Sequence, residues 1–277
     1  MSTTIVKADG TAELFNENKL RNSLKKAGAN KDEVVSVLHQ IEQELYEGMS
    51  TEEIYRKAFT YLREEGIPTA ARYSLRRALF GLGPTGFPFE DFLGRIFKEE
   101  AYNVKVGSTI MGSCVPHEID VAAYKSDHAF VAEVKFHNHP GIKTDLQVIM
   151  YNYARKLDIE SHKICEADIC GIKDFMIVTN TKFTSMAKRH ANCVGLQLLS
   201  WDYPAHTNLH DRIRATGLYP ITVLQSLSNA QKRTLIERKI IVCSDLHKKP
   251  AVLRHLHLSA RKTETVLSEA RQLCQKS

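Results

Sequence analysis

The octapeptide GLGPTGFP, residues 81–88, limits more than any other feature how this chain can fold. It places three glycines and two prolines in eight positions. Glycine and proline both disfavour a helix interior, so no helix is expected to run through it. Helical spacing of apolar residues dominates before this stretch, and strands alternate with helices after it. We therefore predict a domain boundary here, between a domain of residues 1–83 and one of residues 86–205.

The part before the boundary predicts a β-hairpin followed by four helices. The segments IVKADG and AELF have strand composition and are joined by a turn that contains glycine. Three helices are expected at residues 16–29, 31–48 and 50–66, where apolar residues recur at helical spacing and capping residues stand at the starts. A fourth helix is expected after Pro68.

The part after the boundary alternates between helices and strands, which predicts an α/β domain with a mixed sheet flanked by helices. Short helices rich in leucine and basic residues are expected in a third segment, residues 206–277. The overall class is therefore α/β, or α+β when the helical parts are included. The expected elements of the middle part are helix 89–101, strand 102–107, hairpin 117–136, helix 145–159, strand 174–180, helix 184–192 and strand 196–202.

Positive charge is concentrated in the third segment. The chain has a formal net charge of +6, and residues 206–277 hold 13 Lys and Arg against 5 Asp and Glu. Such an asymmetry is typical of a segment that binds a polyanion, and DNA is the partner we expect. Two other interpretations are a solvated basic face without a partner and helices that pack onto the central domain.

Several protein classes are disfavoured by composition. The first residues lack the apolar region of a secretory signal. A membrane-spanning helix would need a run of about 18 apolar residues, and the sequence has no such run. The cysteines show neither CxxC pairs nor a zinc-like spacing with histidine. We expect a cytoplasmic protein with reduced, mostly buried thiols, no membrane contact and no disulfide framework. The cysteines are Cys114, Cys165, Cys170, Cys193, Cys243 and Cys274.

Charged residues stand on the strands of the predicted hairpin HEIDVAAYKSDHAFVAEVKF, residues 117–136. The turn would bring Asp120 close to Glu133 across the strand pair, with Lys135 on the same face as Glu133. Two adjacent carboxylates repel each other unless a cation lies between them. Mg²⁺ would neutralise both carboxylates and could polarise a phosphate. Lys135 could then stabilise the negative charge that develops on the phosphate. This is the chemistry of phosphodiester hydrolysis. A solvated ionic cluster without catalytic use is the alternative.

The acidic residue, the hairpin and the Glu-x-Lys motif, preceded by a helix and followed by strand, helix and strand, resemble the PD-(D/E)xK nuclease superfamily. Within it the pattern is most similar to Mrr-type restriction endonucleases and archaeal Holliday junction resolvases. The resemblance implies that Asp120, Glu133 and the carbonyl of Val134 ligate Mg²⁺ or Mn²⁺, that Lys135 is the catalytic lysine, and that Glu90 adds a carboxylate from the preceding helix. The "PD" dipeptide is absent, since His117, Glu118 and Ile119 separate Pro116 from Asp120.

Other polar residues near the motif are expected to support the site or its loops. His137 and His139 follow the lysine and are interpreted as an ordinary polar loop. On the next helix, Gln147 and Tyr151 are candidates for supporting the site. We expect the run from Thr179 to Thr181 to cap a helix.

The N-terminal hairpin IVKADGTAELFNENKL, together with GMSTEEIYRKAFTYL and TAARYSLRRAL, resembles the ATP-cone, a regulatory nucleotide-binding domain of ribonucleotide reductases and their transcriptional repressor. The likeness covers about residues 3–82. It implies an adenine nucleotide ligand, ATP or dATP, held by eight residues. Lys7 and Lys19 would meet the triphosphate, Glu13 and Asn16 would lie near the nucleotide, and the base pocket would be lined by Ile5, Leu20, Thr51 and Ile54.

Together these patterns predict a nucleotide-regulated, divalent-metal-dependent DNA endonuclease, used in restriction, repair or junction processing. The C-terminal segment has a weak similarity to helix-hairpin-helix modules and would hold DNA by phosphate contacts. A homo-oligomer is expected because cutting both strands needs two active sites. The alternative is a non-catalytic, nucleotide-responsive DNA-binding regulator with an inactive nuclease fold.

Overall fold

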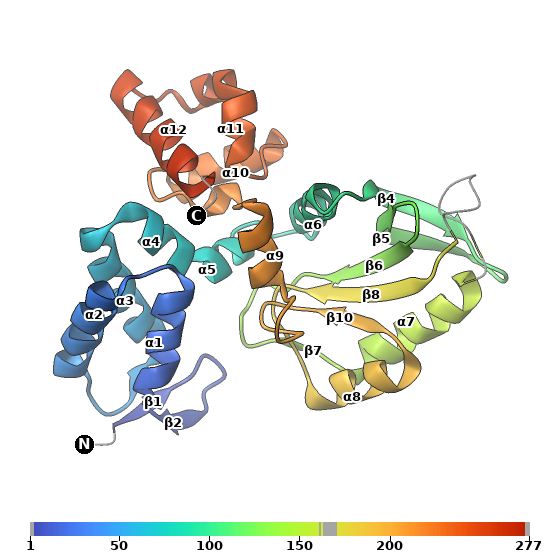
Figure 1. Cartoon of the computed structure of the whole chain (residues 1–277), viewed down its shortest axis with the longest axis horizontal. Coiled ribbons are helices and arrows are strands. Elements are labelled where there is room, and N and C mark those ends of the chain that lie inside the picture. The colour runs from blue at the N-terminus through green and yellow to red at the C-terminus, as the bar shows by residue number, and fades with distance from the viewer. Residues whose placement is uncertain (1–2, 161, 163–170, 275–277) are drawn as a thin grey trace.

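The computed structural model describes residues 3–160, 162 and 171–274 (Figure 1). A helical N-terminal part lies beside a central sheet that has helices on both faces, and the C-terminal helices lie next to α4 and α5 of the N-terminal part (Figure 1). In the described part of the chain, no helix is both long and apolar enough to span a bilayer.

The N-terminal part begins with the predicted hairpin, and its three short strands are ordered β2-β1-β3. Asn16, Asn30 and Ser50 each cap a helix by accepting a backbone N–H, which confirms the first three predicted helices. The fourth is two helices that meet at Ser74. The elements are β1 (Thr4–Val6), β2 (Ala12–Leu14), α1 (Glu17–Lys26), α2 (Lys31–Glu44), β3 (Met49–Ser50), α3 (Thr51–Glu65), α4 (Ile67–Tyr73) and α5 (Leu75–Phe80).

The central part contains the predicted mixed sheet, with the order β10-β8-β6-β5-β4. The pairs β10–β8 and β8–β6 are parallel, whereas β6–β5 and β5–β4 are antiparallel. The elements are α6 (Phe87–Glu99), β4 (Asn103–Met111), β5 (Pro116–Tyr124), β6 (Ala129–Lys135), β7 (Lys143–Thr144), α7 (Leu146–Ile159), β8 (Asp174–Thr179), β9 (Lys182–Phe183), α8 (Ser185–Val194) and β10 (Gln197–Leu199).

Each face of this sheet has its own apolar core, because neighbouring strand residues point to opposite sides. Val121 and Ala132 pack on the α6 side, and Ala122 and Val131 pack on the side of α7 and α8. Gly94 lets α6 approach β4 closely, since a Cβ atom there would lie 2.7 Å from a methyl carbon of Val106. The acidic end of β5 therefore lies between two fixed helical layers.

The C-terminal helices pack onto the central part, as one interpretation of the sequence expected. Their apolar residues form one cluster with α5 and α6, and Arg95 of α6 contacts Asp245 at 2.6 Å. Thr222 donates to the carbonyl oxygen of Ala78 at 2.6 Å, which fastens α5 to this segment. Its elements are α9 (Leu209–Thr216), η2 (Ile221–Val223), α10 (Asn229–Glu237), α11 (Ser244–Lys248), η3 (Pro250–Leu256) and α12 (Ala260–Cys274).

The described thiols agree with the prediction only in part, because Cys114 and Cys193 are exposed and not buried. Cys114, Cys193, Cys243 and Cys274 are free, and Cys243 is fully buried. The two remaining cysteines, Cys165 and Cys170, lie outside the described residues.

Candidate functional site

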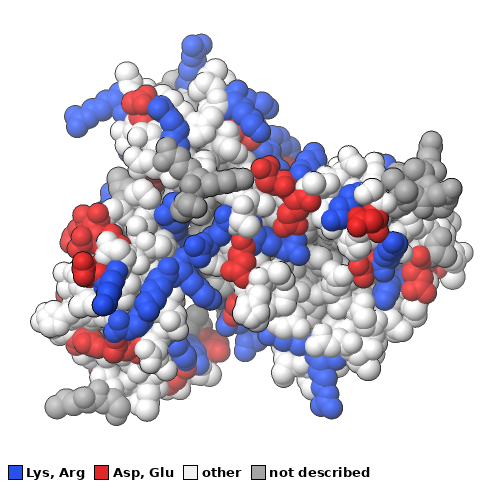
Figure 2. Space-filling view, in the orientation of Figure 1, with Lys and Arg blue, Asp and Glu red and all other residues white. Residues whose placement is uncertain are grey.

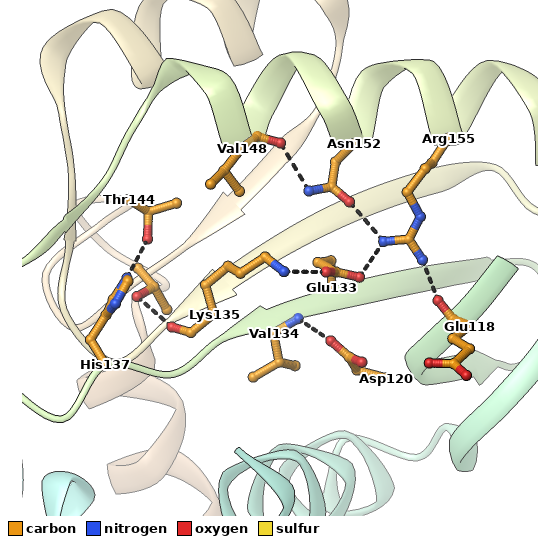
Figure 3. Close-up of polar contacts among 11 residues, drawn as sticks. Glu118, Asp120, Glu133, Val134, Lys135, His137, Thr144, Val148, Asn152 and Arg155 are labelled. Carbon is orange, nitrogen blue, oxygen red and sulfur yellow. Dashed lines mark hydrogen bonds and ion pairs between the residues drawn. The ribbon is translucent and has the colours of Figure 1, made fainter. Parts of the chain in front are cut away.

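The hairpin of β5 and β6 holds Asp120 at the point where the two strands stop pairing. The last antiparallel pair toward this end joins Val121 and Ala132. Beyond it, the side chain of Asp120 accepts the backbone N–H of Val134 at 2.6 Å (Figure 3). A carboxylate oxygen thus replaces a strand-to-strand hydrogen bond. This contact fixes Asp120 next to the segment that carries Glu133 and Lys135.

Glu133 lies between two cations. Lys135 donates to one of its carboxylate oxygens and Arg155 of α7 donates to the other (Figure 3). Arg155 also donates to Asn152 at 3.0 Å and to the carbonyl oxygen of Glu118. Glu133 is 7% exposed and Arg155 is equally buried, so this is a desolvated ion pair with its hydrogen bonds satisfied.

Glu90 reaches the same site from α6. Its pKa is raised to about 7, first by burial and then by the charges of Asp120, Asp91 and Glu133, while the charge of Lys135 opposes the rise. The pKa of Asp120 is also raised, first by burial and then by Glu133. These mutual effects show that the carboxylates of Glu90, Asp120 and Glu133 share one electrostatic environment. The structure therefore brings together the predicted site residues from three separate elements.

The donor set suits a hard divalent cation, although it is not assembled around one. Among the described residues, no group of three or more His, Cys, Asp and Glu stands ready to hold a metal ion. The available donors are oxygens, which Mg²⁺ and Mn²⁺ prefer. Burial is the main cause of the raised pKa of Glu90 and Asp120, and a cation would offset the smaller contribution from repulsion between the carboxylates. Glu133 would need to exchange a contact with Lys135 or Arg155 to become a ligand.

Buried polar residues of β8 and the turn after it hold the segment that follows Lys135. Thr179 donates to the carbonyl oxygen of Lys135 at 2.8 Å, and Asn180 exchanges hydrogen bonds of 2.9 and 2.8 Å with the backbone of His137. The predicted capping role for Thr179 to Thr181 is wrong, because Thr184 caps α8. This polar run instead positions the backbone on which Lys135 stands.

The two histidines behave as the predicted polar loop. The ring of His137 lies 3.1 Å from the hydroxyl of Thr144, and its pKa is lowered by burial and by the charge of Lys135. His139 is exposed.

The supporting residues on α7 differ from those predicted. Gln147 and Tyr151 are exposed, and Asn152 and Arg155 occupy the buried face instead. Tyr151 still reaches the edge of the site, because the centre of its ring lies 5.7 Å from the guanidinium carbon of Arg155. A signal for them existed in the sequence. Ile149, Asn152, Arg155 and Ile159 recur at helical spacing, so a polar pair stood at positions where that pattern demands apolar residues.

A second predicted site lies at the N-terminal hairpin, where one acid contacts two lysines. Lys7 and Lys19 contact Glu13 at 2.7 and 2.9 Å. Hydrogen bonds from Lys7 and Lys19 lower the pKa of Glu13, and the bond to Glu13 raises the pKa of Lys7. Two cations that share one carboxylate keep an excess of positive charge, which suits a polyphosphate.

A pocket of about 190 Å³ opens next to these charges. It is lined by seven of the eight predicted nucleotide residues, and Lys7 is the exception. Tyr55 and Tyr73 also line it, and their rings stack at 5.2 Å and 9°. Neither tyrosine was predicted from the sequence; Tyr55 follows the predicted Ile54 on α3, and Tyr73 is the last residue of α4. The predicted lining residues are Ile5, Glu13, Asn16, Lys19, Leu20, Thr51 and Ile54.

Comparisons with known proteins agree with part of this description. Residues 3–79 match the model of the ATP cone domain, and residues 219–274 match that of the C-terminal part of AF1548-like proteins. The names of the similar proteins give no activity, so the nuclease assignment stays a prediction.

Two similar proteins cover much of the chain. A crystal structure of the protein of unknown function AF1548 shares 34% identity and a TM-score of 0.55, covering 70% of this chain and 100% of that one. An uncharacterized protein of Archaeoglobus fulgidus is 35% identical over 182 residues, which are 65% of this chain and 99% of the relative. The chain therefore belongs to the family of this Archaeoglobus fulgidus protein, and it carries an ATP cone domain at its N-terminal end and an AF1548-like C-terminal part.

Proposed function

We propose that this protein is a DNA endonuclease that depends on a divalent metal and is regulated by an adenine nucleotide. The observation that carries the proposal is the convergence of Glu90, Asp120, Glu133 and Lys135 where β5 and β6 separate. Three carboxylates and a lysine gathered in a half-buried site are costly to maintain. A role in chemistry gives a reason for that cost.

The roles follow from exposure and charge. Mg²⁺ or Mn²⁺, held by Asp120, Glu133 and the carbonyl oxygen of Val134, would supply a polarised phosphate and an acidified water. Lys135 has a side chain that is 33% exposed, so its ammonium can meet a phosphate that approaches from solvent. Arg155 is buried and holds Glu133 in place. Glu90, with a pKa of about 7, can accept or release a proton near neutrality.

Regulation by the N-terminal domain is supported by its contact with the loop after Lys135. A Cβ atom built on Gly141 would lie 3.8 Å from the carbonyl oxygen of Ala8, in the turn between β1 and β2. The charge of Lys143 contributes to the lowered pKa of Asp9 in the same turn, after the larger effect of Thr11. A nucleotide that moves this hairpin would therefore press on the segment that leads from Lys135 to β7.

A second candidate function is a nucleotide-responsive DNA-binding regulator without catalysis. One observation favours it. Both oxygens of Glu133 contact cations of the chain itself, which is also the arrangement of a structural ion pair.

The test is cleavage of plasmid and branched DNA with Mg²⁺ or Mn²⁺, with and without ATP and dATP. Lys135→Ala should abolish cutting, and Lys98→Ala should not, because Lys98 is an exposed lysine of α6 outside the site. A nucleotide should alter the rate of the unmodified protein. Equal cutting by both variants would refute the catalytic role of Lys135. Binding of DNA that responds to nucleotide, without any cutting, would favour the regulator.

A further inference from the structure

A cavity of about 770 Å³ lies where the three parts of the chain meet. Its walls come from α3 and α5, from the turn between α5 and α6, from Asn138 in the loop after Lys135, and from η2 and α10 of the C-terminal segment. The pocket of about 190 Å³ at the N-terminal hairpin is a separate space, and Tyr55 lines both. No predicted site residue lines the larger cavity.

The wall of this cavity is basic and has no acid of its own. Arg56, Arg77, Lys232 and Arg233 line it, and none of the described lining residues is Asp or Glu. Arg77 pairs with Glu52 and lies 4.4 Å from the centre of the Tyr55 ring. Among the described residues, no carboxylate forms an ion pair with Arg56, Lys232 or Arg233. Burial lowers the pKa of Lys232, and the charge of Glu269 opposes that effect.

Such a wall suits an anion, because Arg56 and Arg233 line the same space without an ion-pair partner among the described residues, and like charges that face one space repel each other. Three of the four are arginines, whose planar guanidinium groups match phosphate oxygens. Figure 2 also shows exposed lysine and arginine side chains between the N-terminal helices and the central part. Acidic side chains lie beside them in the same view, so the excess of positive charge belongs to the cavity wall and not to the whole junction.

The position of the cavity relates it to the acidic site. Asn138 stands three residues after Lys135. A Cβ atom on Gly83 would lie 2.6 Å from the side-chain oxygen of Asn138, and one on Gly86 would lie 3.1 Å from a carboxylate oxygen of Glu90. The turn of residues 83–86 therefore borders the cavity on one side and the acidic site on the other. A phosphate chain that crosses the acidic site has the cavity as its neighbour.

We propose that this junction cavity binds the phosphodiester backbone of DNA, with Arg56 of the N-terminal domain and Arg233 of the C-terminal segment contacting phosphates. The inference rests on the proposed function, because it supplies the nuclease site with a place to hold its substrate. The contacts involve no base edges and are therefore independent of sequence. DNA in the cavity would touch all three parts of the chain at once.

The test is DNA binding without metal, so that cleavage does not interfere. A short fluorescein-labelled duplex is titrated by anisotropy at several salt concentrations with Arg56→Ala, Arg233→Ala and the double variant. Each lost phosphate contact should weaken binding. The plot of the logarithm of the binding constant against the logarithm of the salt concentration has a negative slope, and each lost contact should make it less steep by about 0.9. Arg189→Ala is the matched control, because Arg189 is an exposed arginine of α8 far from the cavity in sequence and should leave the slope unchanged. Circular dichroism checks that every variant is folded.

The outcomes separate this inference from the nuclease proposal. Unchanged slopes in both arginine variants would overturn the inference, even for a protein that cuts DNA normally. Reduced slopes in a protein that cuts nothing would support the cavity and refute the nuclease. Calorimetric titration with ATP and with inorganic triphosphate forms a third arm. If the Arg56 and Arg233 variants lose a binding site for ATP or triphosphate but still bind DNA normally, the cavity binds a free nucleotide and the inference is overturned.

Discussion

At the scale of single residues, the candidate site depends on how one buried carboxylate is neutralised. Glu133 receives Lys135 from its own strand and Arg155 from α7. Lys135 is accessible to solvent, whereas Arg155 is buried and also contacts Asn152 and the backbone of Glu118. In the proposed function Lys135 is therefore the cation that would contact a ligand, whereas Arg155 would maintain the fold.

Removing Arg155 should cost stability. Arg155→Met leaves Glu133 without one of its cations in a buried position, and we expect the free energy of unfolding to fall by on the order of 3 kcal/mol. Adding Glu133→Gln to the same chain should restore much of the loss, because the uncompensated charge disappears. Denaturant unfolding of the two single variants and the double variant measures the coupling. A loss that the second change does not reduce would contradict the ion-pair explanation.

Glu90 should make stability depend on pH. Its pKa is about 7 in the folded chain, against an ordinary value of 4.5, so the folded state keeps a proton that the unfolded state has lost. Stability therefore falls as pH rises from about 4.5 through about 7. Glu90→Gln should remove this fall, whereas Glu99→Gln, at an exposed position of the same helix, should not. Unfolding at pH 5 and pH 8 gives the measurement, and parallel profiles for all three proteins would refute the raised pKa.

At the scale of elements, the site depends on the approach of α6 to the sheet. Glu90 stands on the first turn of α6, and Gly94 follows one turn later against β4. Because residue 94 has only a hydrogen atom as its side chain, α6 can pack directly against Val106. This close packing lets α6 bring the carboxylate of Glu90 to Asp120.

Gly94→Ala should therefore displace α6. The added methyl group would meet Val106 at 2.7 Å, and Val is stiff because it is branched at Cβ. We expect a loss of about 1–3 kcal/mol in the free energy of unfolding from overpacking. Lys98→Ala, on the exposed side of the helix, is the control and should be close to neutral. Equal stability of Gly94→Ala and the parent would show that the two elements separate easily.

Much of this element layout could be predicted from the sequence, and the failures have physical reasons. Period-two alternation and a polar turn identified the hairpin of β5 and β6, and capping residues identified α1, α2 and α3. Arg155 was missed because a salt bridge inside a core leaves no local pattern, only a polar residue at an apolar position. The break at Ser74 and the contact of Tyr73 with Tyr55 depend on packing between distant segments. The junction cavity has no sequence signal, since its walls come from three regions.

At the scale of the whole molecule, the nucleotide pocket and the junction cavity share a wall. Tyr55 lines both spaces, stacks on Tyr73 in the pocket, and lies under Arg77 in the cavity. Glu52, next to the predicted base-pocket residue Thr51, pairs with Arg77. A ligand in one space would therefore contact a residue that also lines the other, which is the route we expect for coupling between them.

Nucleotide and DNA should accordingly change each other's affinity by the same factor. We expect ATP to shift DNA affinity by about fivefold or more, within the usual range of coupling between sites. Glu52→Gln breaks the pair with Arg77 and should bring that factor toward one, with little effect on ATP binding in the absence of DNA. Anisotropy titrations with and without ATP measure the factor. An unchanged factor in the variant would show that coupling takes another route.

The packing of α5 has a consequence for how such coupling can operate. Leu75 and Leu79 of α5 lie in one apolar cluster with α6 and the C-terminal helices, and both are fully or almost fully buried. Swinging the N-terminal domain away would expose them to water at a cost of about 1.5–3 kcal/mol each. The domain is thus expected to signal by small local displacements and not by a hinge. Small-angle X-ray scattering should then give the same radius of gyration with and without ATP.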